Sequence, residues 1–362
     1  MPHTSCSLFG TPPEDGVAPW PTYVPLAPWF IHGHETLWVD IDSTPEALKT
    51  FRERLRPMAH GIRPGSEGHG HLVVVSGLSG TGKSSLLHRC VHELVQLLDA
   101  AAGGKQDDDG PDGERRPLWS RRAPARSTYI VGLDGSGNDG HGIGSPPGRT
   151  PLVPQFDMVI DRVLRVVAAE LGKDPDFVSA LADPFLTWRA LTDILEALDR
   201  RLVVIVPHIP WNDADLSRRF LRFCHDRSSR GVVFFVETTH TGVEGDLAFF
   251  TERERKSITH IQTRQLRADD WAKYLELWMA LPDVPDPTIA IDEDVLEYRP
   301  DDWALASIST LQDCLRRLVE EALRHNAGHL RRHHVATWFE ANRPTPDHYM
   351  RNPGAPRRGP TR

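Results

Sequence analysis

The sequence predicts an α/β fold, in which helices flank a parallel β-sheet and a helical domain follows the sheet. Short apolar runs rich in β-branched residues recur along the chain, as buried parallel strands require. Amphipathic helical segments separate these runs, and after residue 268 the strand-like runs stop while helical patterns continue. The expected strands are 72–75, 127–133, 201–206, 231–236 and 257–263.

The composition predicts a largely globular protein with reduced thiols. The 362 residues allow a large core, and the net charge of −8 argues against general attraction to nucleic acids or membranes. The four cysteines lie far apart and form no C-x-x-C pair. The chain begins without a signal-like segment, and no apolar run reaches membrane-spanning length. We expect a cytoplasmic protein with no membrane partner and no indicated nucleic acid. The scarcity of lysine, six of 42 basic residues, suggests a GC-rich bacterial genome.

Residues 1–70 are expected to form a proline-rich arm and a short N-terminal αβ segment. Prolines suppress regular structure up to about residue 30. The aromatic residues of this arm are expected to pack on their own domain rather than on a partner. A short strand is expected at 36–41. The run Ser43-Thr44-Pro45-Glu46 combines a cap, an early proline and an acid, so a helix should begin there and end near Leu55.

One loop after the first expected strand carries the strongest functional signal. The stretch Gly77-Leu78-Ser79-Gly80-Thr81-Gly82-Lys83-Ser84 reads G-x-x-x-x-G-K-S, the phosphate-binding P-loop. Its glycines let backbone N–H groups approach phosphate oxygens, and the following helix adds partial positive charge. Lys83 should reach the β- and γ-phosphates, and the Ser84 hydroxyl should ligate Mg²⁺. With Ser85, these residues form the predicted site for ATP and Mg²⁺.

The segment 71–265 is therefore expected to be a P-loop NTPase core. Disordered insertions rich in Gly, Asp, Arg and Pro are expected near 100–125 and 135–154. The second insertion follows Asp134, at the end of a strand. It would lie beside the nucleotide or form a mobile surface loop, and both interpretations stay open. Helices are expected at 155–171, 188–198 and 216–225.

The segment 266–342 is expected to form a helical lid, followed by a disordered tail at 343–362. Three helices are expected in the lid, at 268–281, 304–325 and 328–341. His325, His329 and His333 would share one face of a continuous helix. With arginines beside them, we interpret this face as basic and polar rather than as a zinc site.

This layout resembles the AAA+ ATPases and, less specifically, the related STAND NTPases, over about residues 72–341. The resemblance implies five parallel strands with a helical lid. In that family the third strand ends in the Walker B acids, but Pro207 and His208 stand at this position, and Asp213 and Asp215 come several residues later. Two acids that end other strands, Asp134 and Glu237, could substitute for them. Alternatively, each of these acids caps a strand end or a helix.

The resemblance also implies three sites that respond to the γ-phosphate. A sensor-1 position would fall at Glu237, Thr238 or Thr239, at the end of the fourth strand. An arginine finger would fall at Arg253 or Arg255, which otherwise belong to a solvated helix end. A sensor-2 arginine would be Arg331, where Gly328-His329-Leu330-Arg331 opens a helix.

Two functions follow from these features. The first is an ATP-binding AAA+-like NTPase that acts as the nucleotide-driven component of a bacterial multi-protein system, as a homo-oligomer or with a protein partner. The alternative is a hydrolysis-deficient nucleotide-binding switch or scaffold, which the missing Walker B acids favour. Whether the chain is an ATPase is left open by its sequence.

Overall fold

The structure is a computed structural model of the whole chain. It describes residues 28–29, 35, 38–41, 43–62, 70–78, 80–101, 128–132, 156–170, 184–209, 214–228, 231–239, 242–267, 269–279, 290–300, 308–325 and 328–343. Both expected insertions fall almost entirely outside these ranges, as do nearly all of the proline-rich arm and of the tail. No described helix combines the length and the apolar character that crossing a bilayer requires.

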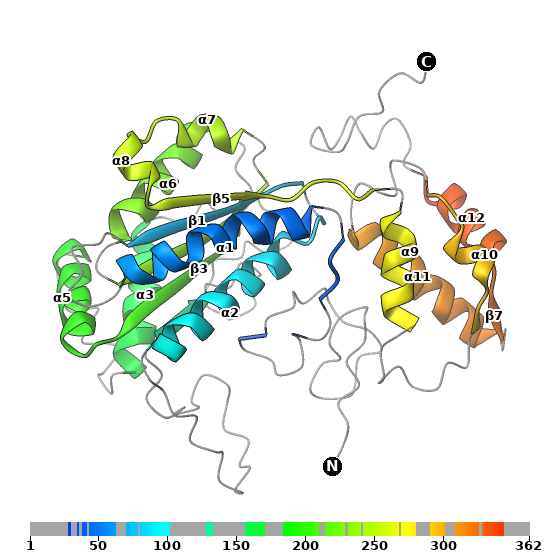
Figure 1. Cartoon of the computed structure of the whole chain (residues 1–362), viewed down its shortest axis with the longest axis horizontal. Coiled ribbons are helices and arrows are strands. Elements are labelled where there is room, and N and C mark those ends of the chain that lie inside the picture. Colours follow the sequence, from blue (N-terminus) through cyan, green and yellow to red (C-terminus); the bar gives the residue numbers. More distant parts are fainter. Residues whose placement is uncertain are drawn as a thin grey trace, which may run out of the picture.

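A five-stranded sheet, with all neighbouring strands parallel, forms the centre of the fold (Figure 1). All five strands expected from the sequence are present, in the order β2-β3-β4-β1-β5. Their bounds are β1 (His71–Ser76), β2 (Thr128–Gly132), β3 (Arg201–Ile209), β4 (Val232–Thr238) and β5 (Ile258–Gln262). Because β4 lies directly beside β1, the carboxyl end of β4 is next to the P-loop.

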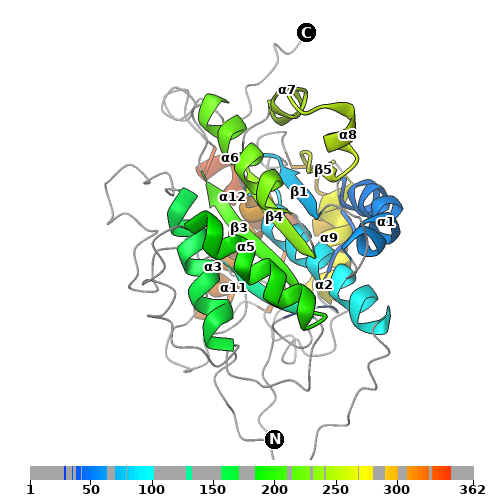
Figure 2. The ribbon, with the colours of Figure 1, turned by 90° about the vertical axis from the view of Figure 1, so that its left-hand side faces the viewer.

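Helices cover both faces of the sheet, which explains the apolar character of its strands (Figures 1 and 2). One face packs on α1 (Thr44–Gly61) and α2 (Lys83–Ala101). The other packs on α3 (Phe156–Glu170), α5 (Pro184–Ala197) and α6 (Ala214–Arg227). Side chains of β1 alternate between the two cores, with Leu72 and Val74 in one and Val73 and Val75 in the other.

The first helix is longer than predicted, and the strand expected at 36–41 is wrong. Within that range, residues 38–41 are described and form no strand. Trp38 and Asp40 lie against α2 instead, where the Arg89 guanidinium lies 4.5 Å from the Trp38 ring centroid and donates to Asp40 Oδ1 at 2.8 Å. Val39 and Ile41 pack in the core of the C-terminal domain. Trp29, an aromatic residue of the arm, donates from Nε1 to His88 Nδ1 at 2.9 Å and so packs on its own domain, as expected. The helix α1 continues past Leu55 to Gly61, and its last turns bury Met58 and Ala59 in the core shared with α2.

The C-terminal domain is helical, as expected, but it also contains a small sheet. Its helices are α9 (Asp270–Met279), α10 (Glu293–Leu296), α11 (Ile308–Arg324) and α12 (Arg332–Ala341). The expectation that strands stop at residue 268 is wrong, because β6 (Ala290–Ile291) and β7 (His329–Leu330) pair in parallel. Two-residue strands carry no readable alternation, and β7 takes the positions expected to open the last helix. The three histidines therefore do not lie on one continuous helix.

His71, the first residue of β1, makes the stability of the fold dependent on pH. Its side chain is buried, and Nε2 lies 2.8 Å from Thr259 Oγ1. Burial, with smaller contributions from Arg54 and His225, lowers the pKa of His71 from 6.5 to about 3. The unfolded chain therefore binds more protons between these values. The stability contribution is complete above pH 6.5 and is lost as the pH falls toward 3.

Between pH 7.5 and pH 5, this residue should lower the free energy of unfolding by about 2 kcal/mol. Urea unfolding at the two pH values measures the loss. His71→Gln should reduce it, whereas His60→Gln, at an exposed position of α1, should leave it unchanged. An equal loss in His71→Gln and in the unmodified protein would contradict the assignment.

Candidate nucleotide-binding site

The P-loop lies between the carboxyl end of β1 and the first residue of α2, as predicted. Gly77, Gly80 and Gly82 all have positive φ, at 152°, 77° and 77°. At Gly77 the space is also occupied, because a Cβ there would lie 2.0 Å from Thr263 Oγ1. Glycine is therefore required for this path of the chain. Ser79 of the predicted set lies outside the described residues.

Lys83 is held inside the loop. Its side chain is 4% exposed, and Nζ donates to the Leu78 carbonyl oxygen at 2.6 Å. Burial lowers the pKa of Lys83, and the neighbouring Glu237 carboxylate opposes this shift. A buried ammonium with one carbonyl and a carboxylate at 4.0 Å is under-compensated, so the loop is well suited to take up an anion.

Glu237 brings a carboxylate to the P-loop from β4. It stands opposite Val75 in the register between β4 and β1. Ser84 Oγ donates to Glu237 Oε2 at 2.7 Å, and Oε1 lies 4.0 Å from Lys83 Nζ. Burial raises the pKa of Glu237, while the Ser84 hydrogen bond and the Lys83 charge lower it. A hydroxyl and a carboxylate at hydrogen-bond distance are oxygen donors of the kind that Mg²⁺ prefers, so these residues fit the implied ion.

The other acids named from the sequence do not join this pair within the described chain. β3 continues through Pro207 and His208 to Ile209, with a register irregularity after Val206. Asp215 lies on α6 with an exposed side chain and pairs with Arg218 at 3.0 Å. Asp134 and Asp213 lie outside the described residues.

Two of the three candidate sensor-1 residues, Glu237 and Thr238, lie on opposite faces of the sheet, and Thr239 follows the end of β4. Glu237 points to the face of α2, and the side chain of the next residue, Thr238, points to the opposite face because successive side chains alternate along a strand. Thr238 is buried and stands opposite Ser76 in the register. Of these two residues, Glu237 is therefore the one directed at the P-loop.

The candidate finger residues Arg253 and Arg255 lie on the short helix α8 (Glu252–Arg255), which precedes β5. β5 runs parallel to β1, so α8 and its arginines lie at the end of the sheet opposite to the P-loop of the same chain. Arg253 and Arg255 are both exposed, and Arg255 Nε donates to the Phe250 carbonyl oxygen at 3.0 Å. Another helix, α7 (Val243–Leu247), precedes them.

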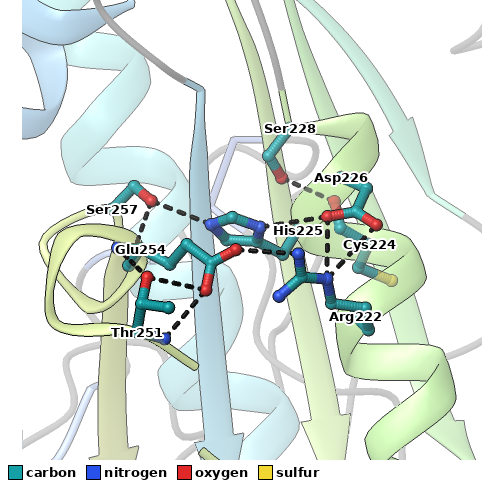
Figure 3. A network of polar contacts seen from close by, with 8 residues as sticks. All are labelled: Arg222, Cys224, His225, Asp226, Ser228, Thr251, Glu254 and Ser257. Carbon is teal, nitrogen blue, oxygen red and sulfur yellow. Dashed lines mark hydrogen bonds and ion pairs between the residues drawn. The ribbon is translucent and has the colours of Figure 1, made fainter. Parts of the chain in front are cut away.

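A network of polar contacts fixes α8 against α6 (Figure 3). Thr251 caps α8 by accepting from the Glu254 backbone N–H, and the Glu254 carboxylate accepts from the Thr251 backbone N–H at 2.8 Å. The same carboxylate pairs with Arg222 of α6 at 2.8 Å. His225 Nε2 lies 3.1 Å from Ser257 Oγ, which donates to the Glu254 carbonyl oxygen. These contacts fix the backbone of α8, which carries the candidate finger residues Arg253 and Arg255.

In the lid, the sequence identified one candidate contact and missed another. Arg331, directly before α12, places Nε 3.4 Å from Asp292 Oδ2, and Figure 1 shows α12 on the side of the lid away from the sheet. A contact between Arg331 and phosphate remains a prediction. The first residue of α11 is nearer the loop, because a Cβ at Gly82 would lie 3.2 Å from Ile308 Cδ1. No motif marks Ile308.

No protein-family model and no curated protein matches this sequence. Among solved structures, it is similar to the Aeropyrum pernix ORC2 protein in ADPNP–ADP complexes, with 14% identity and a TM-score of 0.49 over 85% of this chain and 70% of that one. A second is the CDC6P protein of Pyrobaculum aerophilum, with 13% identity and a TM-score of 0.45 over 79% of this chain and 64% of that one. A third is the Escherichia coli MS115-1 HORMA:CdnC:Trip13 complex, with 11% identity and a TM-score of 0.38 over 87% and 94%.

This chain thus spans about two thirds of the length of the first two similar structures. Its own strands and loop define the fold. A five-stranded parallel sheet, a P-loop between β1 and α2, and a helical lid form an AAA+-like P-loop NTPase fold.

Proposed function

We propose that this protein binds ATP with Mg²⁺ at the P-loop and works as an AAA+-like NTPase, the nucleotide-driven component of a bacterial multi-protein system. One observation carries the proposal. Ser84 Oγ and Glu237 Oε2 lie 2.7 Å apart, beside the Lys83 ammonium, at the carboxyl edge of the sheet. Glu237 of β4 thereby provides the P-loop with a carboxylate, which the end of β3 does not provide.

Each of these residues has a role in the proposal. Lys83 exchanges the Leu78 carbonyl oxygen for phosphate oxygens, which provide the countercharge that the buried ammonium lacks. Ser84 and Glu237 hold the ion, and bound Mg²⁺ would neutralise negative charge on the phosphates. Glu237 is also a candidate to accept a proton from water, because a buried carboxylate with a raised pKa is a stronger base.

A switch or scaffold that binds nucleotide without turnover is the second candidate. The residues at the end of the third strand favour it, because Pro207 and His208 provide no carboxylate. If the protein did hydrolyse ATP, Glu237 would have to bind the ion and also activate the attacking water, since it is the carboxylate that the described chain places at the P-loop. We expect slow or absent hydrolysis in the isolated chain, and steady-state phosphate release with and without candidate partners separates the two functions.

Titration with a fluorescent ATP analogue tests the proposal directly. Binding should be saturable and tighter with Mg²⁺ than with a chelator, since the Ser84–Glu237 pair supplies oxygen ligands. Absence of binding under both conditions would remove the proposed function. Binding that is indifferent to Mg²⁺ would remove the assigned role of this pair.

The partner is proposed to be a second copy of this chain or a related NTPase, which would bring its nucleotide to Arg253 and Arg255. We expect ATP-dependent association, weakened by Arg253→Ala with Arg255→Ala and by salt, since contacts to phosphate are charge-assisted. Light scattering with ATP, with ADP and without nucleotide measures this association. Arg54→Ala with Arg56→Ala, an exposed pair of equal spacing on α1, is the control. A particle that stays monomeric in all three conditions, alone and with related NTPases, would contradict the prediction.

A further inference from the structure

We propose that Thr263 is a positioning residue for the P-loop, and that its hydroxyl couples the state of Lys83 to the connection between sheet and lid. The inference rests on the proposed nucleotide binding and adds a means of regulating that site. Thr263 directly follows β5 and is 4% exposed. From Thr263 the chain continues through a short connection into α9 of the lid.

Thr263 contacts the chain directly before the P-loop and the middle of the loop. Its backbone N–H donates to the carbonyl oxygen of Ser76, the last residue of β1, at 2.8 Å, and its Oγ1 lies 3.2 Å from the same oxygen. The Oγ1 also lies 2.7 Å from Thr81 Oγ1 within the loop. The requirement for glycine at position 77 comes from this same hydroxyl oxygen. One side chain therefore sets the entrance and the middle of the loop.

A count of protons shows that this cluster has two arrangements. The Leu78 carbonyl oxygen accepts from Lys83 Nζ at 2.6 Å and lies 2.8 Å from Thr81 Oγ1. Each hydroxyl has a single proton to donate. In one arrangement, Thr81 donates to Thr263, which donates to Ser76. In the other, Thr263 donates to Thr81, which donates to Leu78.

Engagement of Lys83 by phosphate selects between these arrangements. While Lys83 donates to Leu78, that carbonyl oxygen has a charged donor, and Thr81 is free to donate to Thr263. When Lys83 turns to phosphate, the Leu78 oxygen needs the Thr81 proton, because an unpaired carbonyl group is unfavourable. The Thr263 proton then leaves the Ser76 oxygen for Thr81. The event at Lys83 thereby changes the bonding of the residue from which the lid connection departs.

The connection is itself fixed next to this residue. The Arg264 backbone N–H donates to Ser43 Oγ at 2.9 Å, directly before α1. Arg267 N–H then donates to Asp270 Oδ2 at 2.6 Å, at the start of α9. Thr263 thus lies between the P-loop, where the hydrogen-bond donors to Leu78 change, and the connection 264–267, which is held by hydrogen bonds. Its hydroxyl therefore couples the P-loop to the connection that leads into the lid.

Thr263→Val, which removes the hydroxyl at nearly constant volume, tests the proposal against Thr263→Ser, which keeps it. We expect the valine variant to lose about tenfold in affinity for the ATP analogue, and the serine variant about twofold or less. Nucleotide-induced protection of residues 264–279 from hydrogen exchange should be lost in the valine variant and kept in the serine variant. Equal losses in both variants, or no loss in either, would overturn the role of the hydroxyl.

Thr81→Val provides a second route if Thr263→Val fails to fold, because it breaks the same chain of donors. We expect Thr81→Val to lose about tenfold in affinity and the nucleotide-induced protection of residues 264–279, whereas Thr81→Ser should keep both, and equal behaviour of these two variants would overturn the coupling. If both valine variants fold, the double variant should lose no more affinity than Thr263→Val alone, and additive losses would overturn the coupling. A parent protein that fails to bind the analogue would overturn the proposed function as well. That outcome is distinguishable, because it appears before any variant is compared.

Discussion

Lys83→Ala should abolish binding of ATP analogues, with a loss in affinity of about 100-fold or more, while the protein remains folded. The loss is large because the ammonium group would make charge-assisted contacts to phosphate in a water-poor loop. The fold should tolerate the change. Lys83 is buried, its pKa is lowered by that burial, and within the described chain its hydrogen bond is to a loop carbonyl rather than to the core.

Fluorescence titration measures the affinity, and thermal unfolding without ligand checks the fold. Lys273→Ala is the matched control, since Lys273 lies on α9 with a half-exposed side chain and pairs with Asp269. It should bind the analogue as the parent protein does. Unchanged affinity in Lys83→Ala would remove the central claim for the site.

Glu237→Gln should eliminate the Mg²⁺ dependence of nucleotide binding, and any phosphate release should fall by about 10²- to 10³-fold. The amide oxygen can still accept the Ser84 hydrogen bond, so the local structure should persist. What disappears is the negative charge that holds the ion and the basic group that accepts a proton. Binding in the presence of a chelator should change little.

Asp134→Asn is the informative comparison, because Asp134 is the other strand-end acid that could replace the Walker B residues. Titrations with Mg²⁺ and with chelator, together with phosphate release, are measured for both variants. We expect the asparagine variant to behave like the parent protein. The reverse result, in which Asp134→Asn removes Mg²⁺ dependence and Glu237→Gln does not, would transfer the role to Asp134.

The sheet was predictable because buried parallel strands leave a direct trace in the sequence. Four of the five strands contain a continuous apolar run, and the P-loop joins the first run to an amphipathic helix. The fifth, β5, reads Ile-Thr-His-Ile-Gln and left a weaker trace. The strand expected at 36–41 failed because a short apolar stretch is also compatible with a segment packed on a helix. The pairing of β6 with β7 could not be read, since two residues show no period.

The candidate site was predictable only in its local part. The motif identified Lys83 and Ser84, and a strand-end position identified Glu237. The sequence could not rank Glu237 above Asp134, because that needs the strand order, which puts β4 directly beside β1. The contact of Thr263 with Thr81 joins residues 182 positions apart, and no sequence period connects them.

The two crossings of the chain between sheet and lid are bonded to each other, and this restricts how the lid can swing. Ile41 packs in the lid core, whereas Ser43, directly before α1, accepts the hydrogen bond from Arg264 on the other crossing. A domain attached by one flexible segment could reorient in any direction. Because the two connections are hydrogen-bonded to each other through Ser43 and Arg264, we expect the lid to rotate about this point rather than to translate along the sheet. Opening and closing of the lid should therefore move Ile308 away from or toward Gly82.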